Sequence, residues 1–569
     1  MKAPAKKVKI GDVLLHLGYI DEEQLHTAIK SHKENGIKLG EALVQLGYID
    51  ESALGTALAD QLKIPFLDLK HYPIKPEIIR KVPERVARRY RVLLIDIVRG
   101  EYLIGMTDPT DVMALDELNH VLGPKMRVAV VSESDVMRVI DLVYRRTEDI
   151  VSFAAELKDE IGKSQAKIAD ITEVTEATDA PVAKLLESIF EDAVQMSASD
   201  IHIEPDENFL RIRQRVDGAL QEHIVHGKEI VSALVLRIKL IANLNISEKR
   251  LPQDGRISIK IKKHELDVRI STMPVYYGES VVMRLLDKSG GVRNFSQLGM
   301  PETILNRVQV IIHKPYGMFL VTGPTGSGKT TTLYAVLNEL NTVEKKIITI
   351  EDPVEYTLPR VNQVQVNQEI GLTFAHVLRS ALRQDPDIVM VGEMRDEETV
   401  EIGLRSAMTG HLVLSTLHTN DSISSATRLM DMGAKGFLLA GALRGVLAQR
   451  LVRRICDSCI TDYKLQKNDE TWILGMFPDV DQGRLEHLKQ GKGCSRCNQT
   501  GYRGRIGVYE LFEMDAPLED ALREGDTTTF THLAQTQPTF KPLAHSAFQY
   551  ALEGITTLSE VFKVIGGTG

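Results

Sequence analysis

The sequence predicts an α/β protein of several domains, and three observations carry this prediction. The chain has 569 residues, which is more than one hydrophobic core organises, so about three or four domains are expected. Between residues 318 and 417, apolar runs that end in polar residues alternate with helical patterns, as in a parallel sheet covered by helices. A glycine-rich segment, residues 323–330, follows the first of these runs and opens a helix.

The composition is that of an ordinary globular protein, with 43% hydrophobic and 26% charged residues. The formal net charge of −9 argues against a general nucleic-acid binder, which normally carries a basic excess. No apolar run approaches the roughly 18 residues that span a bilayer, and no apolar signal-peptide core follows the basic N-terminus. We therefore expect a cytoplasmic protein that reaches a membrane only through a partner.

The N-terminus contains an internal repeat. The segment Lys9 to Glu22 recurs 29 residues later as Lys38 to Glu51. Each copy has a short helical pattern that ends at a glycine, followed by an aspartate suited to cap a second helix. We expect two helical hairpins over residues 9–61, completed by a small α/β unit to form an N-terminal module of residues 1–145.

The rest of the chain divides by composition. Residues 146–181 are acidic and nearly free of aromatic side chains, which is typical of a solvated linker, and we expect this linker to contain some helix. A second α/β domain is expected over residues 182–290, with strands near 209–213 and 265–270. Residues 291–569 then form the largest domain, which includes a cysteine-containing subdomain at 450–506 and a helical C-terminus at 515–569.

The glycine-rich segment has the spacing Gly-x-x-x-x-Gly-Lys-Thr between the apolar run 318–322 and a helix that begins near Lys329. Its glycines let backbone N–H groups approach phosphates, and the helix N-terminus adds a favourable dipole. Lys329 is expected to reach the β- and γ-phosphates of ATP, and the Thr330 hydroxyl to bind Mg²⁺. A glycine-rich turn without a ligand is the alternative, which the flanking strand and helix disfavour. The expected nucleotide-binding residues are Gly323, Pro324, Thr325, Gly326, Ser327, Gly328, Lys329, Thr330 and Thr331.

Two further apolar runs end in acids, at Glu351 and at Glu393. At the carboxyl ends of parallel strands, a carboxylate can hold the hydration shell of Mg²⁺ or polarise the attacking water. Alone, each acid would more often be a helix cap, but beside a phosphate loop a catalytic role is favoured for both. The residues leave open which of the two activates water. His411 and His418 flank the run 412–417, and each is either structural or a sensor of the γ-phosphate.

All four cysteines lie in two Cys-x-x-Cys pairs, Cys456 with Cys459 and Cys494 with Cys497. In a reducing compartment such pairs indicate metal ligation rather than disulfides. Four thiolates match a structural zinc site, in which no coordination position stays open for catalysis. Two redox pairs or buried thiols are the alternative.

In this order, the segments 323–330, 350–356, 385–395 and 409–420 resemble the Walker A, Asp, Walker B and His boxes of the secretion ATPase superfamily of type II secretion and type IV pilus assembly. The resemblance continues through 199–205, 213–218 and 249–256 and covers nearly the whole chain. It implies a RecA-like P-loop ATPase core preceded by a PAS-like α/β domain, in a homohexameric motor that acts on an inner-membrane platform protein.

The same resemblance implies that arginines of the smaller α/β domain approach the phosphates and neutralise charge on the transferred phosphoryl group. The commoner fate of an arginine is a surface ion pair, which is the alternative for each. The arginines in the matching segments are Arg213, Arg215, Arg250, Arg269 and Arg284, and of these Arg213, Arg215 and Arg269 are the expected catalytic residues.

The N-terminal repeat resembles the cyclic di-GMP-binding module of MSHA pilus biogenesis ATPases, and the match extends through Pro65, Phe66 and residues 107–111. Two similar hairpins also offer equivalent half-sites for a two-fold symmetric ligand such as cyclic di-GMP; a helical docking module is the alternative. The chain has Lys9 and His32 where the first motif of that family has Arg and Gln. The expected effector residues are Lys9, Ile10, Gly11, Leu14, Leu25, Ile29, His32, Lys38, Leu39, Gly40, Leu43, Leu54, Leu58, Gln61 and Asp108.

Together these resemblances imply an ATP-hydrolysing motor that drives assembly of a type IV pilus of the MSHA kind and is regulated by cyclic di-GMP. ATP and Mg²⁺ would occupy the motor site and Zn²⁺ the cysteines, in a cytoplasmic protein peripheral at the inner membrane. The close alternative is a type II secretion ATPase that powers exoprotein export, because the motor boxes are shared. The cysteine region resembles that of assembly and secretion ATPases, and retraction ATPases typically lack it. A nucleotide-gated scaffold and a nucleic-acid translocase are further alternatives.

Overall fold

The computed structural model describes residues 10–35, 38–69, 72, 75–98, 100–144, 150, 153–154, 171–226, 229–287, 291 and 294–566. The chain divides into two compact units, residues 1–152 with 187–195 and residues 153–186 with 196–569. Among the described residues, no helix combines the length and the apolar character needed to cross a bilayer.

The first unit begins with two pairs of helices, α1 (Ile10–His16) with α2 (Glu22–Asn35) and α3 (Leu39–Gln45) with α4 (Glu51–Leu62). Gly18 and Gly47 follow the shorter helices at φ of +72°, a left-handed conformation that favours glycine. The carboxylates of Asp21 and Asp50 accept from backbone N–H groups of the longer helices at 2.8 and 2.7 Å and so cap them. Both pairs are therefore built from the same local contacts.

A small α/β unit follows. Its elements are α5 (Pro76–Ile79), α6 (Glu84–Tyr90), β1 (Val92–Val98), β2 (Glu101–Met106), α7 (Val112–Leu122), β3 (Met126–Val130) and α8 (Glu133–Val143). β1 and β2 pair antiparallel, whereas β2 and β3 pair parallel. Phe66 bridges to Val130 beside this sheet, and the Glu51 carboxylate accepts from the backbone N–H and hydroxyl of Ser134 at 3.0 and 2.6 Å. These contacts join the helical pairs to the sheet.

Helix α10 (Ile171–Gln195) crosses the boundary that the sequence placed at residue 182. The last part of the expected linker, residues 171–181, is therefore helical. Acidic composition is compatible with a helix as well as with coil, so composition could not locate the boundary. Residues 155–170 of the linker lie outside the described part of the chain.

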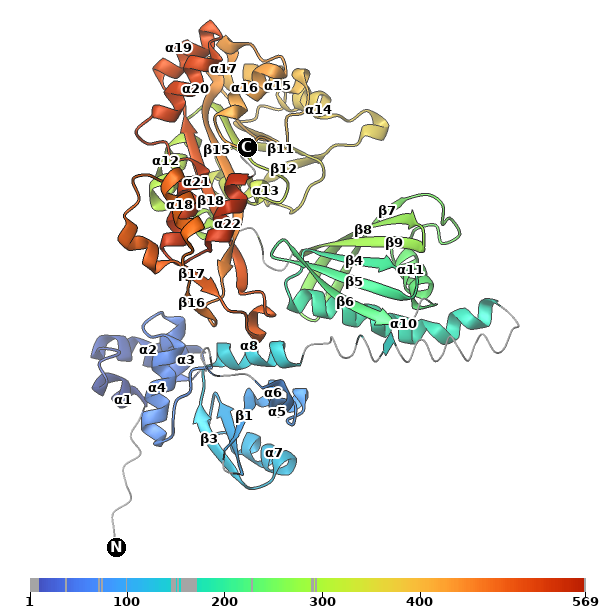
Figure 1. Cartoon of the computed structure of the whole chain (residues 1–569), viewed down its shortest axis with the longest axis vertical. Helices are drawn as coiled ribbons and strands as arrows, with labels where there is room; N and C mark the ends of the chain where they lie inside the picture. Colours follow the sequence, from blue (N-terminus) through green and yellow to red (C-terminus); the bar gives the residue numbers. More distant parts are fainter. Residues whose placement is uncertain are drawn as a thin grey trace. The chain divides into compact units, whose positions relative to one another are not determined.

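Residues 200–287 form an antiparallel sheet with the strand order β6-β5-β4-β9-β8-β7. Its elements are β4 (Asp200–Pro205), β5 (Phe209–Val216), β6 (Ala219–His226), α11 (Glu229–Ile241), β7 (Gln253–Ile261), β8 (His264–Val275) and β9 (Gly278–Asp287). The strands expected near 209–213 and 265–270 lie within β5 and β8, as predicted. Helix α11 buries Ile230, Leu234 and Ile238 completely, and it packs beside β9 (Figure 1).

The largest domain is built on a seven-stranded sheet with the order β12-β11-β13-β14-β10-β15-β18. The strands are β10 (Gly317–Thr322), β11 (Ile347–Glu351), β12 (Val361–Gln365), β13 (Ile388–Val391), β14 (Leu412–Leu417), β15 (Leu443–Ile455) and β18 (Tyr502–Glu513). Neighbouring strands run parallel except β15 and β18. β10, β11, β13 and β14 are buried along their whole length, as expected for a parallel sheet covered on both faces.

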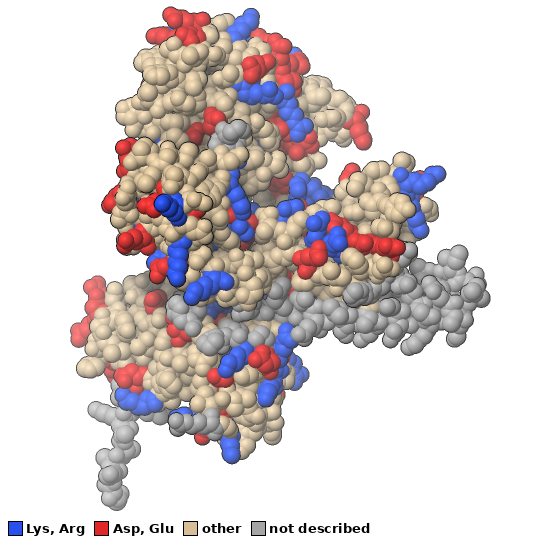
Figure 2. Space-filling view, viewed as in Figure 1, with Lys and Arg blue, Asp and Glu red and all other residues tan. Residues whose placement is uncertain are grey.

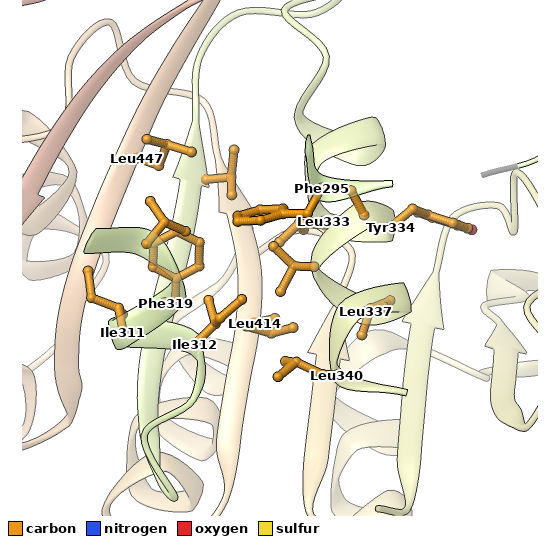
Figure 3. Close-up of a cluster of buried hydrophobic side chains, with 14 of the residues drawn as sticks. Phe295, Ile311, Ile312, Phe319, Leu333, Tyr334, Leu337, Leu340, Leu414 and Leu447 are labelled. Atoms are coloured by element: carbon orange, nitrogen blue, oxygen red, sulfur yellow. The ribbon is translucent and has the colours of Figure 1, made fainter. Parts of the chain in front are cut away.

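Successive residues of β10 enter different cores, because side chains alternate between the faces of a sheet. Phe319 packs with Leu333 and Leu414 in the cluster of Figure 3, under α12 (Glu302–Ile312) and α13 (Lys329–Leu340). Met318 and Leu320 belong to a second cluster on the other face. The helices of that second cluster are α15 (Glu397–Met408), α16 (Ser424–Asp431), α17 (Gly436–Ala442), α19 (Ala516–Glu524) and α20 (Thr527–Thr536), and α14 (Phe374–Ala381) covers the sheet near β11 and β13.

A subdomain is inserted between β15 and β18. It contains β16 (Ile460–Asp462), α18 (Lys467–Met476), the 3₁₀ segments Gln482–His487 and Ser495–Cys497, and β17 (Lys489–Gly491). The C-terminal helices α21 (Leu543–Leu552) and α22 (Leu558–Gly566) share an apolar cluster with it, in which Phe477 stacks on Phe548 at 4.3 Å between ring centroids.

Acidic and basic side chains lie interspersed over the described part of the face shown in Figure 2.

Candidate nucleotide site

The glycine-rich loop joins the buried strand β10 to α13, which begins at Lys329. Gly323 has a φ of +145°, and a Cβ there would lie 2.3 Å from the backbone oxygen of Gln449. Only glycine avoids this clash, so β15 and the loop can approach closely. The Gln449 side chain accepts from the Thr332 hydroxyl at 2.6 Å, which fixes the first turn of α13 to the same strand.

The loop forms one wall of a cavity of about 440 Å³, a volume in the usual range of small-molecule sites. Residues 325–331 line it, together with Glu351, Asp352, Glu355, Glu393, Thr416, His418, Leu451 and Arg505. Gly323 and Pro324 contribute their backbone oxygens, which accept from the Lys329 ammonium at 2.7 and 3.1 Å. The structure thus places the loop residues expected at a nucleotide around one cavity.

The electrostatics of the cavity centre on Lys329. Burial lowers the pKa of Lys329 to about 8, and the negative charge of Glu393 partly opposes this shift. Burial also lowers the pKa of His418, and the positive charge of Lys329 adds to that effect. A bound anion would stabilise the charged lysine, so the site is suited to a phosphate group.

The two candidate glutamates occupy different environments. Glu351 ends β11 with 3% of its surface exposed. Its carboxylate accepts from the hydroxyls of Tyr334 and Thr349, both at 2.5 Å, and from the Gln363 amide at 3.1 Å. Burial, together with the hydrogen bond to Glu351, raises the pKa of Tyr334. Both oxygens of Glu351 are therefore engaged by neighbours within the fold.

Glu393 follows β13 and faces the charged groups of the cavity. It forms an ion pair with Arg395, and its Oε2 lies 3.5 Å from Nε2 of His418. His418 follows β14 at its carboxyl end, whereas His411 precedes the strand and its Nδ1 contacts the backbone oxygen of Ser406 at 3.1 Å. Of the two histidines, His418 lines the cavity.

Each candidate arginine is paired with a carboxylate. The pairs are Arg213 with Glu204 at 2.5 Å, Arg215 with Asp200 at 3.7 Å, Arg284 with Asp200 at 3.0 Å, Arg250 with Glu248 at 3.1 Å and Arg269 with Glu355 at 2.7 Å. Among these partners, Glu355 lines the cavity. The structure therefore brings Arg269 to the site from β8 through its contact with Glu355.

Arg505 lines the cavity but was not selected from the sequence as a site residue. It lies on β18, and its Nε is 3.4 Å from Asp217 in the turn between β5 and β6. The backbone N–H of the neighbouring Gly504 also donates to Asp217 at 2.7 Å. The motif Gly-Tyr-Arg-Gly-Arg at 501–505 resembled the ATPase superfamily, but nothing local showed that its last arginine reaches the phosphate loop.

The four cysteines come together in the inserted subdomain, and all four are free thiols. Their sulfurs lie within 4.8 Å of one another, with distances of 3.9 Å for Cys456–Cys494, 3.8 Å for Cys459–Cys497 and 3.7 Å for Cys494–Cys497. Four sulfurs at the usual Zn–S length of about 2.3 Å in a tetrahedron are about 3.8 Å apart. The donor set and its spacing therefore fit Zn²⁺.

The N-terminal module brings two expected effector residues together across 70 positions. The Lys38 ammonium donates to the Asp108 carboxylate at 2.5 Å. Burial opposes ionisation of Asp108, but hydrogen bonds from Lys38 and Thr110 lower its pKa overall. Gly11 and Gly40 occupy equivalent places in the two helical pairs, each packed against a leucine. A Cβ at Gly11 would lie within 3 Å of a methyl group of Leu25, and a Cβ at Gly40 within 3 Å of a methyl group of Leu54.

The remaining effector candidates divide by burial. Leu14 and Leu43 are fully buried in the core between the helices, where they pack the helical pairs; a role for them at the effector stays a prediction. His32 is exposed, and the partly exposed candidates are Ile10, Leu25, Ile29, Leu39, Leu54, Leu58 and Gln61. Lys9 lies outside the described residues.

Comparison with known proteins agrees with this geometry. The model of the family described as type II/IV secretion system protein matches residues 175–563, and that of the MshEN domain matches residues 62–150. The type IV pilus assembly ATPase PilB of Myxococcus xanthus (strain DK1622) is 40% identical over 559 residues, which cover 97% of this chain and 98% of the relative. Type II secretion system protein E of Pseudomonas aeruginosa is 42% identical over 493 residues, which cover 85% of this chain and 96% of the relative.

Two solved structures are similar to parts of this chain, and the first of them shares the fold of the part that it covers. The ATPase DotB of Legionella pneumophila has a TM-score of 0.50 at 21% identity and covers 67% of this chain and 95% of its own. A structure of MshE with cdg is 31% identical, with a TM-score of 0.23, and covers 24% of this chain and 99% of its own. The matched family model and the full-length relatives show that this chain is an ATPase and belongs to the type II/IV secretion system protein family.

Proposed function

We propose that this ATPase is the motor of type IV pilus assembly, of the MSHA kind, and that cyclic di-GMP regulates it. The observation that carries the motor assignment is the single cavity shared by the loop 325–331, Glu393 and His418. Pilus assembly is favoured over type II secretion because the PilB relative matches 97% of the chain, whereas the type II protein E relative matches 85%. Phosphate release by the purified full chain tests the activity.

At the site, Lys329 leaves its contacts with the loop oxygens to bind the β- and γ-phosphates, and the Thr330 hydroxyl would hold Mg²⁺. When bound, Mg²⁺ neutralises phosphate charge. Glu393 is the group that orients and deprotonates the attacking water, because its carboxylate faces Lys329 and His418 at the cavity. Glu351 has both oxygens engaged by Tyr334, Thr349 and Gln363, so we assign it a supporting role.

Two arginines are placed to stabilise the developing phosphoryl charge. Arg269 contacts Glu355 at the cavity, and Arg505 forms part of its wall. Arg213 and Arg215 remain proposed phosphate ligands that would first have to leave Glu204 and Asp200. His418 would report the γ-phosphate to the turn that follows it.

The assembly we propose is a homohexamer whose PAS-like domain at 182–290 moves against the RecA-like domain as nucleotide is turned over. It would act on an inner-membrane platform protein and stay cytoplasmic and peripheral to that membrane. Deletion of the gene tests this assignment: cells that lose their surface pili but still export exoproteins would support the pilus role. The reverse phenotype assigns the protein to type II secretion, the alternative that its protein E relatives support.

Cyclic di-GMP is the proposed effector of the N-terminal module. The match of residues 62–150 to the MshEN domain and the two equivalent helical pairs support this proposal. Lys38 supplies a cation beside the N-terminus of α3, where a phosphate is favoured. Titration of cyclic di-GMP into the full chain by calorimetry tests it, and the absence of heat and of thermal stabilisation would reduce the module to a docking domain.

The cysteine cluster is the proposed site of structural Zn²⁺. Cys456, Cys459, Cys494 and Cys497 supply four thiolates at tetrahedral spacing. Backbone N–H groups of Cys494 and Gly501 point at the Cys497 sulfur, each at 3.2 Å, and such donors favour a thiolate. The metal would hold together the segments that enter and leave the inserted subdomain.

A further inference from the structure

Glu510 is a buried carboxylate in the ATPase domain that neither the sequence motifs nor the proposed mechanism uses. It lies on β18 opposite Ala448 of β15, and 3% of its surface is exposed. Burial raises the pKa of Glu510, which is the expected response of a carboxyl group removed from water. A polar group in such a place is costly unless its hydrogen bonds are satisfied.

Three donors satisfy this carboxylate, and they come from two distant parts of the chain. Oε1 accepts from the backbone N–H of Ser422 at 2.7 Å and from the Ser422 hydroxyl at 2.6 Å. Oε2 accepts from the backbone N–H of Leu543 at 2.9 Å. Leu543 is the first residue of α21, which lies beside β18 (Figure 1). One side chain therefore ties the turn after β14 to the start of a C-terminal helix.

The turn that Glu510 holds begins at the nucleotide site. Ser422 lies four residues after His418, and Thr419 between them is bound to the strand that leads into the phosphate loop. The Thr322 hydroxyl accepts from the Thr419 backbone N–H at 3.0 Å and lies 2.7 Å from the Thr419 hydroxyl. The turn is thus fixed at one end by Thr322, directly before Gly323, and at the other end by Glu510.

We propose that Glu510 is a positioning residue for ATP hydrolysis. By holding Ser422 it fixes the turn 419–422, and that turn sets the imidazole of His418 against Glu393, 3.5 Å away. Its second oxygen gives α21 a direct connection to the same turn, so a movement of α21 is transmitted to His418. Glu510 does not line the nucleotide cavity, and its effect on turnover passes through His418.

The test is a double-mutant cycle on the full chain with Glu510→Gln and His418→Ala, read by phosphate release under saturating ATP. Glutamine keeps the shape of the Glu510 side chain. Its NH₂ group replaces one carboxylate oxygen, however, and cannot accept the hydrogen bond that this oxygen received. We expect Glu510→Gln to lower kcat about ten-fold or more, as misplacement of a catalytic group does. Affinity for a non-hydrolysable ATP analogue should stay within about two-fold, because the phosphate loop is unchanged. In the His418→Ala background, Glu510→Gln should have no further effect on kcat.

Glu513→Gln is the matched control, because it makes the same change on the same strand and removes the charge from the contact with Arg307, outside the cavity. Its kcat should equal that of the wild type. If Glu510→Gln does not fold, Ser422→Ala, which removes the hydroxyl donor and keeps the backbone N–H, replaces it in the same cycle with a smaller effect. The proposal would be overturned if Glu510→Gln left kcat unchanged. It would also be overturned if the loss of kcat in the double variant were the product of the losses in Glu510→Gln and His418→Ala. A wild-type chain that released no phosphate would instead contradict the ATPase activity itself.

Discussion

The Tyr334 hydroxyl lies 2.5 Å from the Glu351 carboxylate in the core of the ATPase domain. The contact distinguishes two glutamates that end neighbouring strands and look alike in sequence. Glu351 is engaged by Tyr334, Thr349 and Gln363, while Glu393 faces the cavity cations and His418. The division of roles that we propose for them follows from packing rather than from their motifs.

The first prediction separates these two glutamates. Glu393→Gln should lower kcat about 10²- to 10⁴-fold, the usual contribution of a general base, with little change in melting temperature. Tyr334→Phe leaves a buried oxygen of Glu351 without its donor and should cost about 1–3 kcal/mol of folding free energy. Steady-state kinetics and denaturant unfolding measure the two effects. A larger loss of kcat in Glu351→Gln than in Glu393→Gln would reverse the assignment.

The second prediction concerns pH. Lys329 has a pKa of about 8, and binding a triphosphate stabilises its charged form. Above that pKa the free enzyme must take up a proton to bind, so nucleotide affinity should fall as the pH rises from about 7 to about 9. Calorimetry in buffers of different ionisation enthalpy would detect the proton uptake. Lys329→Ala is the control, whose weaker affinity should lack this proton uptake.

The third prediction addresses the cysteine cluster. The purified chain should contain one Zn²⁺ per molecule, and Cys494→Ser should lower both metal content and melting temperature, since a structural metal contributes folding energy. Turnover should fall as well, because Leu451 and Arg505 reach the cavity from the two strands that bracket the subdomain. Elemental analysis and thermal unfolding supply the readouts. A metal-free chain with an unchanged melting temperature would show that the thiols serve another purpose.

The fourth prediction concerns the effector. Lys38→Ala should weaken cyclic di-GMP binding about ten-fold, the worth of one charge-assisted hydrogen bond. Lys63→Ala is the control, since Lys63 also pairs with an aspartate, Asp60 at 3.0 Å, but lies at the end of α4. Calorimetry on the full chain compares the variants. Equal losses in both would indicate a general effect of charge rather than a site at Lys38.

The phosphate loop could be predicted from sequence because its determinants are local: a buried strand, glycines that admit close backbone approach, and a helix that starts at Lys329. The four cysteines could be grouped for a similar reason, since paired thiols have few other uses in a reducing compartment. Lys38 and Asp108 were both placed among the effector residues only through a family resemblance. Their contact was not predicted, because nothing within either segment points to a partner 70 positions away.

Other features depended on contacts that a linear pattern does not show. Leu14 and Leu43 repeat like ligand-binding residues, but the two pairs of helices enclose them completely. Arg505 reaches the cavity only because β18 lies antiparallel to β15, the strand next to β10. Some helix was expected in the linker, but its start at residue 171 could not be located, because acidic composition does not distinguish a helix from coil.

The central claim is that the loop ending in Lys329 and Thr330 binds the triphosphate that this chain hydrolyses. The most direct test is phosphate release by the full chain with ATP and Mg²⁺, compared between the wild type and Lys329→Ala. We expect the variant to lose at least about 100-fold in kcat/KM, because a buried cation contact to the transferred phosphate is removed. Equal turnover in the two proteins would contradict the account.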